Sequence, residues 1–139
     1  YEFGHLWEYP LRSVCTISTH DMATLRGWWE EDPELTARYY NQVLGQWGEV
    51  PTSAPGWACE EIVRQHLECP SLLCILAFQD WLSMDEDLRY PDANAERINV
   101  PANPRHYWRY RMHLTLEDLM RNKAFNKKMI EMIEETNRY

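Results

Sequence analysis

An uninterrupted apolar run extends from Leu72 to Phe78, with Pro70 before it and Gln79-Asp80 after it. A run that is apolar at every position is typical of a strand buried on both faces, as in a parallel sheet. A buried turn of helix has the same pattern, and periodicity alone does not separate the two. The run therefore favours a strand in a layered α/β fold, with a buried helical turn as the alternative.

A second β-rich run covers residues 13–19 and predicts an earlier strand, because several of its residues are β-branched. Two helices are expected between the strands. One starts at Pro33, with Asp32 as its N-cap, and continues as far as Leu44. The other covers residues 56–68. A strand, a helix pair and a second strand in this order predict a parallel sheet.

Residues 83–106 are rich in Asp, Asn and Pro and predict a long ordered loop, which inside a compact domain is usually functional. A final helix is expected from the N-cap Thr115 to about Glu135, with an interruption near residues 122–126. The chain is short enough to form one domain. Two strands do not make a stable sheet alone, so residues 1–139 are interpreted as part of a larger domain, mostly helical by residue count.

The formal net charge of −8 disfavours a nucleic-acid partner, which needs a basic patch, and an anionic membrane surface for the same reason. No apolar stretch is long enough for a transmembrane helix, and the first residues lack the pattern of a signal peptide. The four cysteines have neither CxxC spacing nor a histidine at zinc-ligand spacing. We expect reduced thiols, a cytoplasmic location and no metal or cofactor, with two disulfides as the less favoured alternative.

Aromatic residues are abundant, with seven Trp and eight Tyr in 139 residues. They fit an aromatic core and a carbohydrate-binding surface equally well. For Trp28 and Trp29 we favour packing against the sheet over a sugar platform, because large aromatics that follow a strand usually fill the core.

The dipeptide His20-Asp21 directly follows the first predicted strand. In parallel α/β folds the carboxyl ends of the strands carry the chemistry. A carboxylate beside an imidazole suits a sugar site in which positive charge develops in the transition state. By itself, however, the dipeptide is a weak motif that also fits an ordinary turn cap.

Three groups of residues occur in a characteristic order: Ser18-Thr19-His20-Asp21 with Thr24-Leu25-Arg26-Gly27-Trp28-Trp29; Phe78-Gln79-Asp80-Trp81-Leu82; and Arg97-Ile98-Asn99-Val100-Pro101 followed by Trp108-Arg109-Tyr110-Arg111. Together they resemble the 4-α-glucanotransferases (amylomaltases and disproportionating enzymes) over roughly residues 13–119. The resemblance implies a (β/α)₈ barrel of which this chain is the C-terminal portion, with the last two strands and their helices.

The resemblance also implies a function, the retaining transfer of α-1,4-glucan segments between maltodextrin or glucan acceptors. Asp21 would be the catalytic carboxylate that stabilises the transition state, and His20 would bind sugar hydroxyls. Asn99 and Pro101 would line the substrate site, although both residue types also favour loops. Asp80 is expected to be a structural cap more than a second carboxylate paired with Asp21.

The nucleophile and the acid/base of such an enzyme have no counterpart in these residues, so this chain alone is expected to be inactive. The alternative is a non-catalytic carbohydrate-binding or assembly module that uses the same aromatic residues. Exposed strand edges would in addition favour self-association of the isolated chain.

Overall fold

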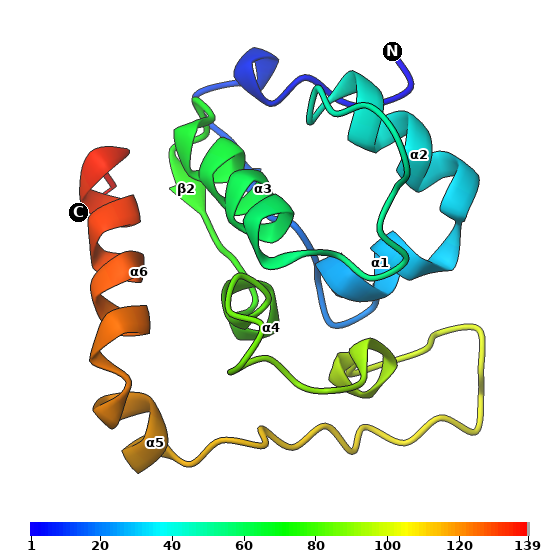
Figure 1. Cartoon of the computed structure of the whole chain (residues 1–139), viewed down its shortest axis with the longest axis vertical. Coiled ribbons are helices and arrows are strands. Elements are labelled where there is room, and N and C mark those ends of the chain that lie inside the picture. The colour runs from blue at the N-terminus through cyan, green and yellow to red at the C-terminus, as the bar shows by residue number, and fades with distance from the viewer. Residues whose placement is uncertain (139) are drawn as a thin grey trace.

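A computed structural model describes residues 1–138 as a mostly helical chain around one small sheet (Figure 1). Among these residues, none of the helices combines the length and the apolar character that crossing a bilayer requires. The elements in chain order are η1 (Leu6–Glu8), β1 (Val14–Cys15), α1 (Leu25–Glu31), α2 (Pro33–Gln42), α3 (Gly56–Glu68), β2 (Leu73–Cys74), α4 (Phe78–Leu82), η2 (Ala93–Glu96), α5 (Leu116–Arg121) and α6 (Lys123–Glu135).

The two predicted strands pair in parallel, as expected from their order along the chain. Val14 lies opposite Leu73, and Cys15 lies opposite Cys74. The regular strands are much shorter than the apolar runs that predicted them, and Phe78 already begins helix α4. A parallel pairing is therefore confirmed, whereas the predicted strand lengths are wrong.

The expectation that the second run is buried on both faces is also wrong. The thiol of Cys15 is buried, and Cys74 packs on the core that includes Val63 of α3. On the opposite face Leu73 is exposed, and Ile75 is 61% exposed. Paired residues point to the same side of a sheet, so α3 covers only one face of this strand pair.

Helices α2 and α3 follow the sequence prediction closely. Asp32 caps α2, its carboxylate accepting hydrogen bonds from the backbone N–H groups of Glu34 and Leu35 at 3.0 Å each. After α2 the chain turns at Gly45, which has a φ of +64°. Glycine adopts this conformation readily because it has no side chain. Helix α3 has the predicted bounds, Gly56–Glu68.

Helix α1 is a third helix between the strands, in addition to the two that the sequence predicted. The Thr24 side chain caps it by accepting a hydrogen bond from the backbone N–H of Gly27 at 3.3 Å. Trp29 is buried in the core and Trp28 packs against it, which confirms packing as the main use of this pair.

The last helical segment divides as predicted. Thr115 and Asp118 form a capping box at the start of α5. Asn122 ends α5 and caps α6, its side chain accepting a hydrogen bond from the backbone N–H of Phe125 at 3.2 Å. Beyond α6, the guanidinium of Arg138 donates to the backbone carbonyls of Cys69, at 2.6 Å, and Ser71, at 2.9 Å. The final helix is thereby fixed to the segment that leads into β2.

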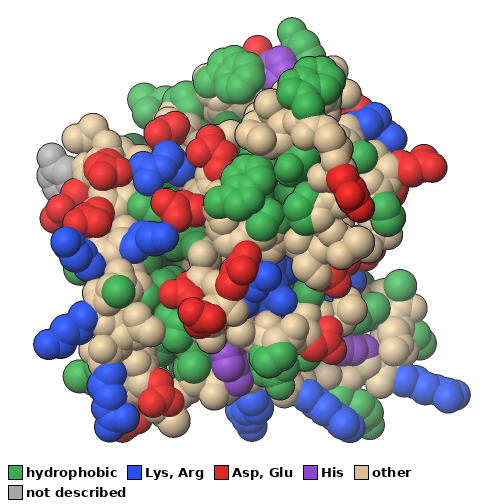
Figure 2. All heavy atoms as spheres, viewed as in Figure 1, with side chains coloured by type: hydrophobic (Ala, Val, Ile, Leu, Met, Phe, Trp, Pro, Cys, Tyr) green, Lys and Arg blue, Asp and Glu red, His purple; other side chains and the backbone are tan. Residues whose placement is uncertain are grey.

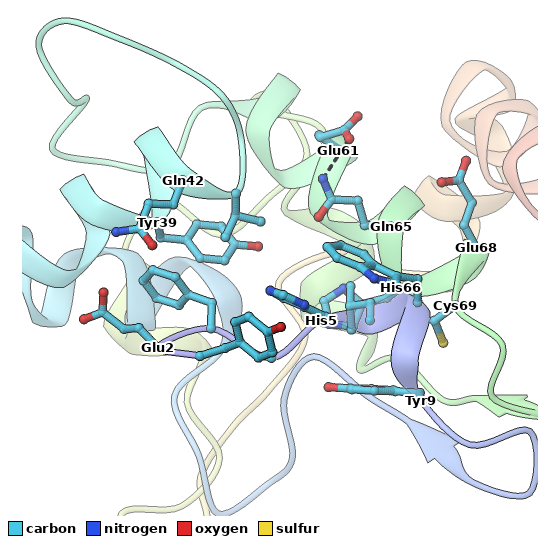
Figure 3. Close-up of a pocket in the computed structure, with 16 residues that line it drawn as sticks. Glu2, His5, Tyr9, Tyr39, Gln42, Glu61, Gln65, His66, Glu68 and Cys69 are labelled. Atoms are coloured by element: carbon cyan, nitrogen blue, oxygen red, sulfur yellow. Dashed lines mark hydrogen bonds between the residues drawn. The ribbon is translucent and has the colours of Figure 1, made fainter.

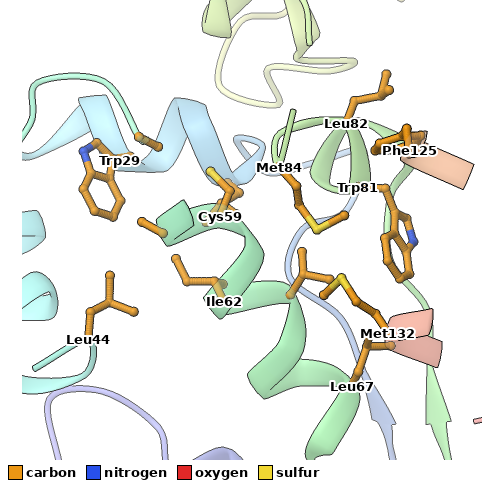
Figure 4. Close-up of a cluster of buried hydrophobic side chains, with 14 of the residues drawn as sticks. Trp29, Leu44, Cys59, Ile62, Leu67, Trp81, Leu82, Met84, Phe125 and Met132 are labelled. Atoms are coloured by element: carbon orange, nitrogen blue, oxygen red, sulfur yellow. The ribbon is translucent and has the colours of Figure 1, made fainter. Parts of the chain in front are cut away.

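The hydrophobic core is built around α3, with side chains from α1, α4 and α6 packed on it (Figure 4). Most of it comes from aliphatic, aromatic and cysteine side chains, among them Trp29, Cys59, Ile62, Val63, Leu67, Trp81, Leu82, Phe125 and Met132. The core thus lies on the helical side of the strand pair, and the other side of the sheet remains open.

We predict that Leu67→Ala lowers the free energy of unfolding by about 2–5 kcal/mol, because it leaves a cavity in this core. The matched control is Leu116→Ala, at an exposed position, which should change it by less than about 0.5 kcal/mol. Urea denaturation of the three proteins measures both changes. Equal effects of the two substitutions would contradict the placement of the core.

Candidate functional site

Three of the four predicted site residues meet at the turn between β1 and α1. The side-chain amide of Asn99 donates a hydrogen bond to Asp21 Oδ1 at 2.7 Å, although 78 positions separate them in the sequence. His20 Nε2 lies 3.3 Å from Asp21 Oδ2. The ring of Trp108 lies beside His20, with 5.2 Å between centroids. We call these four residues the Asp21 cluster.

The Asp21 cluster is open to solvent. The side chain of Asp21 is 52% exposed, and that of His20 is similarly exposed. Both carboxylate oxygens of Asp21 already have a polar neighbour, Asn99 on one side and His20 on the other. The carboxylate is thus oriented by two side chains and still accessible to a ligand.

A tight turn presents His20 and Asp21 between β1 and α1. The backbone N–H of Met22 donates to the carbonyl of Thr19 at 3.1 Å, which closes the turn. Helix α1 starts four residues after Asp21, with its own cap at Thr24. A turn fixed at both ends holds the two side chains in one orientation.

The side chain of Asp80 binds the residues on either side of this turn. It is fully buried, and its Oδ1 accepts a hydrogen bond from the backbone N–H of Leu25, the first residue of α1, at 2.9 Å. Its Oδ2 accepts a hydrogen bond from the hydroxyl of Ser18, at the end of the first β-rich run. Both oxygens are engaged inside the protein, which confirms a structural role and separates Asp80 from the exposed Asp21.

A buried ion pair fixes the loop that carries Asn99. Arg26 Nη1 of α1 lies 2.6 Å from Glu96 Oε1, and Thr24 Oγ1 donates to Glu96 Oε2 at 3.1 Å. Arg26 Nη1 also donates to the backbone carbonyl of Tyr90 at 2.6 Å. Burial raises the pKa of Glu96, while the guanidinium of Arg26 acts in the opposite direction. The network attaches both ends of the segment 90–96 to the helix that follows Asp21.

Sequence reasoning did not identify Glu96 as part of the site. The two available signals were its place directly before the motif 97–101 and the arginine within the motif 24–29. Gln79, from the remaining motif, is buried and donates to the backbone carbonyl of Glu96 at 3.3 Å. All three motifs therefore meet around Glu96.

Pro101 follows Asn99 by two positions in the same loop. It occupies a turn closed by a hydrogen bond from the backbone N–H of Asn103 to the carbonyl of Val100 at 2.9 Å. Its position agrees with ordinary turn chemistry, and a role in substrate binding stays a prediction.

Two cavities lie beside the turn that carries Asp21. One, of about 440 Å³, is lined by Met22, Trp28 and Arg97 among others. The other, of about 180 Å³, lies between α1 and the η2 segment. Within residues 1–138, no three His, Cys, Asp or Glu side chains are grouped so that they could hold a metal ion.

Comparison with known proteins gives a consistent result. A family model described as 4-alpha-glucanotransferase matches residues 1–116. The 4-alpha-glucanotransferase DPE2 of Oryza sativa subsp. japonica is 38% identical over 137 residues, covering 99% of this chain and 14% of that protein. A 4-alpha-glucanotransferase of Chlamydia trachomatis is 31% identical over 120 residues, 86% of this chain and 22% of that protein.

Among solved structures, amylomaltase from Streptococcus agalactiae in complex with acarbose is similar with a TM-score of 0.66. The similarity covers 94% of this chain and 23% of that one, at 23% sequence identity. At this level of identity the likeness establishes a shared fold. This chain thus corresponds to less than a quarter of each of these proteins.

We predict that Glu96→Ala lowers the free energy of unfolding by about 3–5 kcal/mol, because it leaves the buried guanidinium of Arg26 without its charge partner. The control is Glu135→Ala, which breaks the exposed pair with Arg64 and should cost less than about 1 kcal/mol. Chemical denaturation measures both changes. A loss for Glu96→Ala as small as that for the control would contradict this role.

Asp80 should make the stability depend on pH. Burial raises its pKa above the ordinary 3.8, although its hydrogen bonds from Leu25 and Ser18 oppose the shift. The folded state then binds the proton more tightly, so this contribution is complete below pH 3.8 and is lost as the pH rises through the folded pKa. Asp80→Asn removes the titration and should flatten this decline in the free energy of unfolding. An unchanged slope across this pH range would contradict the prediction.

Proposed function

We propose that this chain forms part of the active site of an enzyme that transfers α-1,4-glucan segments between maltodextrin or glucan acceptors. The reason is that the chain belongs to the 4-alpha-glucanotransferase family. The observation that carries the proposal is the hydrogen bond from Asn99 to Asp21. It joins two motifs from distant parts of the sequence around one exposed carboxylate.

The architecture that we infer is the C-terminal portion of a (β/α)₈ barrel, with β1 and β2 as its last two strands. The parallel pairing of the strands supports this, as does the helical cover on one face only. In a complete barrel the open face of Leu73 and Ile75 would be covered by the layers of side chains that fill the interior. Residues 1–139 are then an incomplete domain, in agreement with the small share of the relatives' length that the chain covers.

In this proposal Asp21 stabilises the transition state. Retaining glycosyl transfer passes through an oxocarbenium-like state, and a carboxylate beside the sugar ring favours the charge that develops there. The hydrogen bond from Asn99 and the neighbouring His20 hold the carboxylate in place before that charge appears, so little reorganisation is needed at the moment of reaction. His20 and Asn99 are also close enough to Asp21 to bind hydroxyls of the same sugar.

The nucleophile and the acid/base would come from outside these residues. This chain then contributes one of the carboxylates that the reaction needs, and residues 1–139 alone would be inactive. Trp108 stands beside His20 and offers an exposed ring next to the sugar position. The free state of all four cysteines supports a cytoplasmic location for the parent protein.

A second candidate is a carbohydrate-binding or assembly module without catalysis. The open sheet face, with Val14, Leu73 and Ile75 exposed, favours it for the isolated chain. An exposed apolar face of this kind would drive self-association, and sedimentation of residues 1–139 as a compact monomer would argue against such assembly.

We predict that Asp21→Asn in the complete polypeptide lowers kcat/KM for maltotriose disproportionation by roughly two orders of magnitude or more, because the developing positive charge loses its carboxylate. The matched control is Asp87→Asn, which changes an exposed aspartate outside the Asp21 cluster and should leave the rate unchanged. Glucose release from maltotriose measures all three proteins. Comparable rates for wild type and Asp21→Asn would remove Asp21 from the mechanism.

A further inference from the structure

Three of the four cysteines lie together where the end of α3 meets the strand pair. Cys15 of β1 and Cys74 of β2 lie opposite each other in the parallel register. Cys69, which directly follows α3, shares a side-chain hydrogen bond with Cys15. We call these three residues the thiol cluster. The fourth cysteine, Cys59, lies in the hydrophobic core, and all four thiols are free.

Hydrogen-bond donors surround the sulfur of Cys69. Arg138 Nη2 lies 3.7 Å from Cys69 Sγ, and Ser71 contributes hydrogen bonds from its hydroxyl and its backbone N–H. The guanidinium is fixed there because it also donates to the backbone carbonyls of Cys69, at 2.6 Å, and Ser71, at 2.9 Å. Burial alone would raise the pKa of this thiol, but the hydrogen bonds and the positive charge outweigh burial and lower the pKa below its ordinary value. The thiolate, which is the nucleophilic form, is therefore more populated at Cys69 than at an ordinary cysteine.

Cys15 has the opposite character. Burial raises its pKa and that of Cys74, so both thiols stay protonated near pH 7. The hydrogen bond between Cys15 and Cys69 raises the pKa of the first and lowers the pKa of the second, which makes the S–H of Cys15 the donor. A protonated thiol thus lies in contact with the more acidic one. Oxidation-sensitive cysteines often have such a second thiol beside them, which forms a disulfide with the oxidised sulfur.

A cavity gives small molecules access to Cys69. It has a volume of about 630 Å³ and lies between residues 1–9, the end of α2 and the C-terminal half of α3 (Figure 3). Figure 2 shows hydrophobic side chains and a histidine gathered at the end of the molecule where the N-terminal segment lies. Cys69 lines the cavity together with the titratable His66 and Glu68, but it is only 5% exposed. A small solute can therefore approach this side chain, whereas a bulky reagent is excluded.

We propose that Cys69 is an oxidation site for small peroxides, and that Cys15 converts the product into a disulfide that joins the end of α3 to β1. In the first step the sulfur of Cys69 attacks one oxygen of hydrogen peroxide, so that an S–O bond forms and the O–O bond breaks. The leaving hydroxide takes up a proton and departs as water, and Cys69 becomes a sulfenic acid.

In the second step the sulfur of Cys15 attacks the sulfur of Cys69, so that the S–S bond forms and the S–O bond breaks. The departing hydroxide takes the proton of Cys15 and leaves as water. The two thiols lose two electrons in total, and the peroxide is reduced to water. In reducing compartments such disulfides are usually transient and serve in redox sensing, which agrees with the free thiols of the resting protein.

The test treats the complete polypeptide with hydrogen peroxide, blocks the remaining thiols and maps disulfides by peptide mass spectrometry. A bond between Cys15 and Cys69 is expected, reversible by dithiothreitol, and peptide fragmentation between Cys69 and Cys74 assigns the partner. Cys59→Ser is the matched control, because burial raises the pKa of Cys59 to about 11 and its substitution should leave this bond unchanged. In Cys15→Ser the sulfenic acid should persist, so that dimedone labels Cys69 several-fold more than in the wild type.

Arg138→Gln should slow the reaction of Cys69 with peroxide roughly threefold or more at pH 7, because the thiolate loses its positive neighbour. The pH–rate profile of the reaction should also move to higher pH. Arg138→Lys keeps the charge and should retain most of the rate, which separates this effect from a loosened C-terminal segment. Arg64→Gln is the matched control, because it breaks the ion pair of α3 with Glu135 of α6 and should leave the rate unchanged.

A disulfide between Cys15 and Cys74, with Cys69 unmodified, would overturn the proposal. A thiol at Cys69 that reacts with peroxide no faster than that of Cys59 would overturn it as well. A pH–rate profile that Arg138→Gln leaves unchanged would contradict the assignment of the guanidinium to this site.

Discussion

The buried ion pair between Arg26 and Glu96 is the interaction on which the arrangement of this chain depends. Taking both charges out of water is costly, and the pair offsets that cost only because additional hydrogen bonds surround it. Thr24 donates to one carboxylate oxygen, and the guanidinium also reaches the carbonyl of Tyr90. A long segment with few regular elements is thereby fixed against α1, and Asn99 reaches Asp21 as a consequence.

Local sequence signals predicted the helices well. The Asp32 cap, the Thr115 capping box and the break at Asn122 each depend on a few neighbouring residues, so they are visible without any tertiary information. The order of the elements also predicted the parallel pairing of the strands. The burial of Leu73 and Ile75 was predicted wrongly, because an apolar run reports a preference for burial and not whether the described chain contains the partner that covers it.

The site was predicted in part. His20, Asp21 and Asn99 came from motifs, and the structure brings them together, whereas the binding role of Pro101 stays a prediction. Glu96 escaped prediction because its burial depends on a contact with Arg26, 70 positions earlier in the chain. A carboxylate in a polar loop has the same local pattern whether it is solvated or paired with a distant guanidinium. Pairings of this kind follow from the topology and produce no periodic pattern in the sequence.

The distance in sequence between Asp21 and Asn99 has a consequence for folding during translation. Their 78-residue distance means that the carboxylate is synthesised well before the amide that orients it. At translation speeds of about 5–20 residues per second, the interval is roughly 4–16 s. Throughout that interval the nascent polypeptide carries Asp21 without its hydrogen-bond partner, and the geometry around the carboxylate is completed only once Asn99 has been translated.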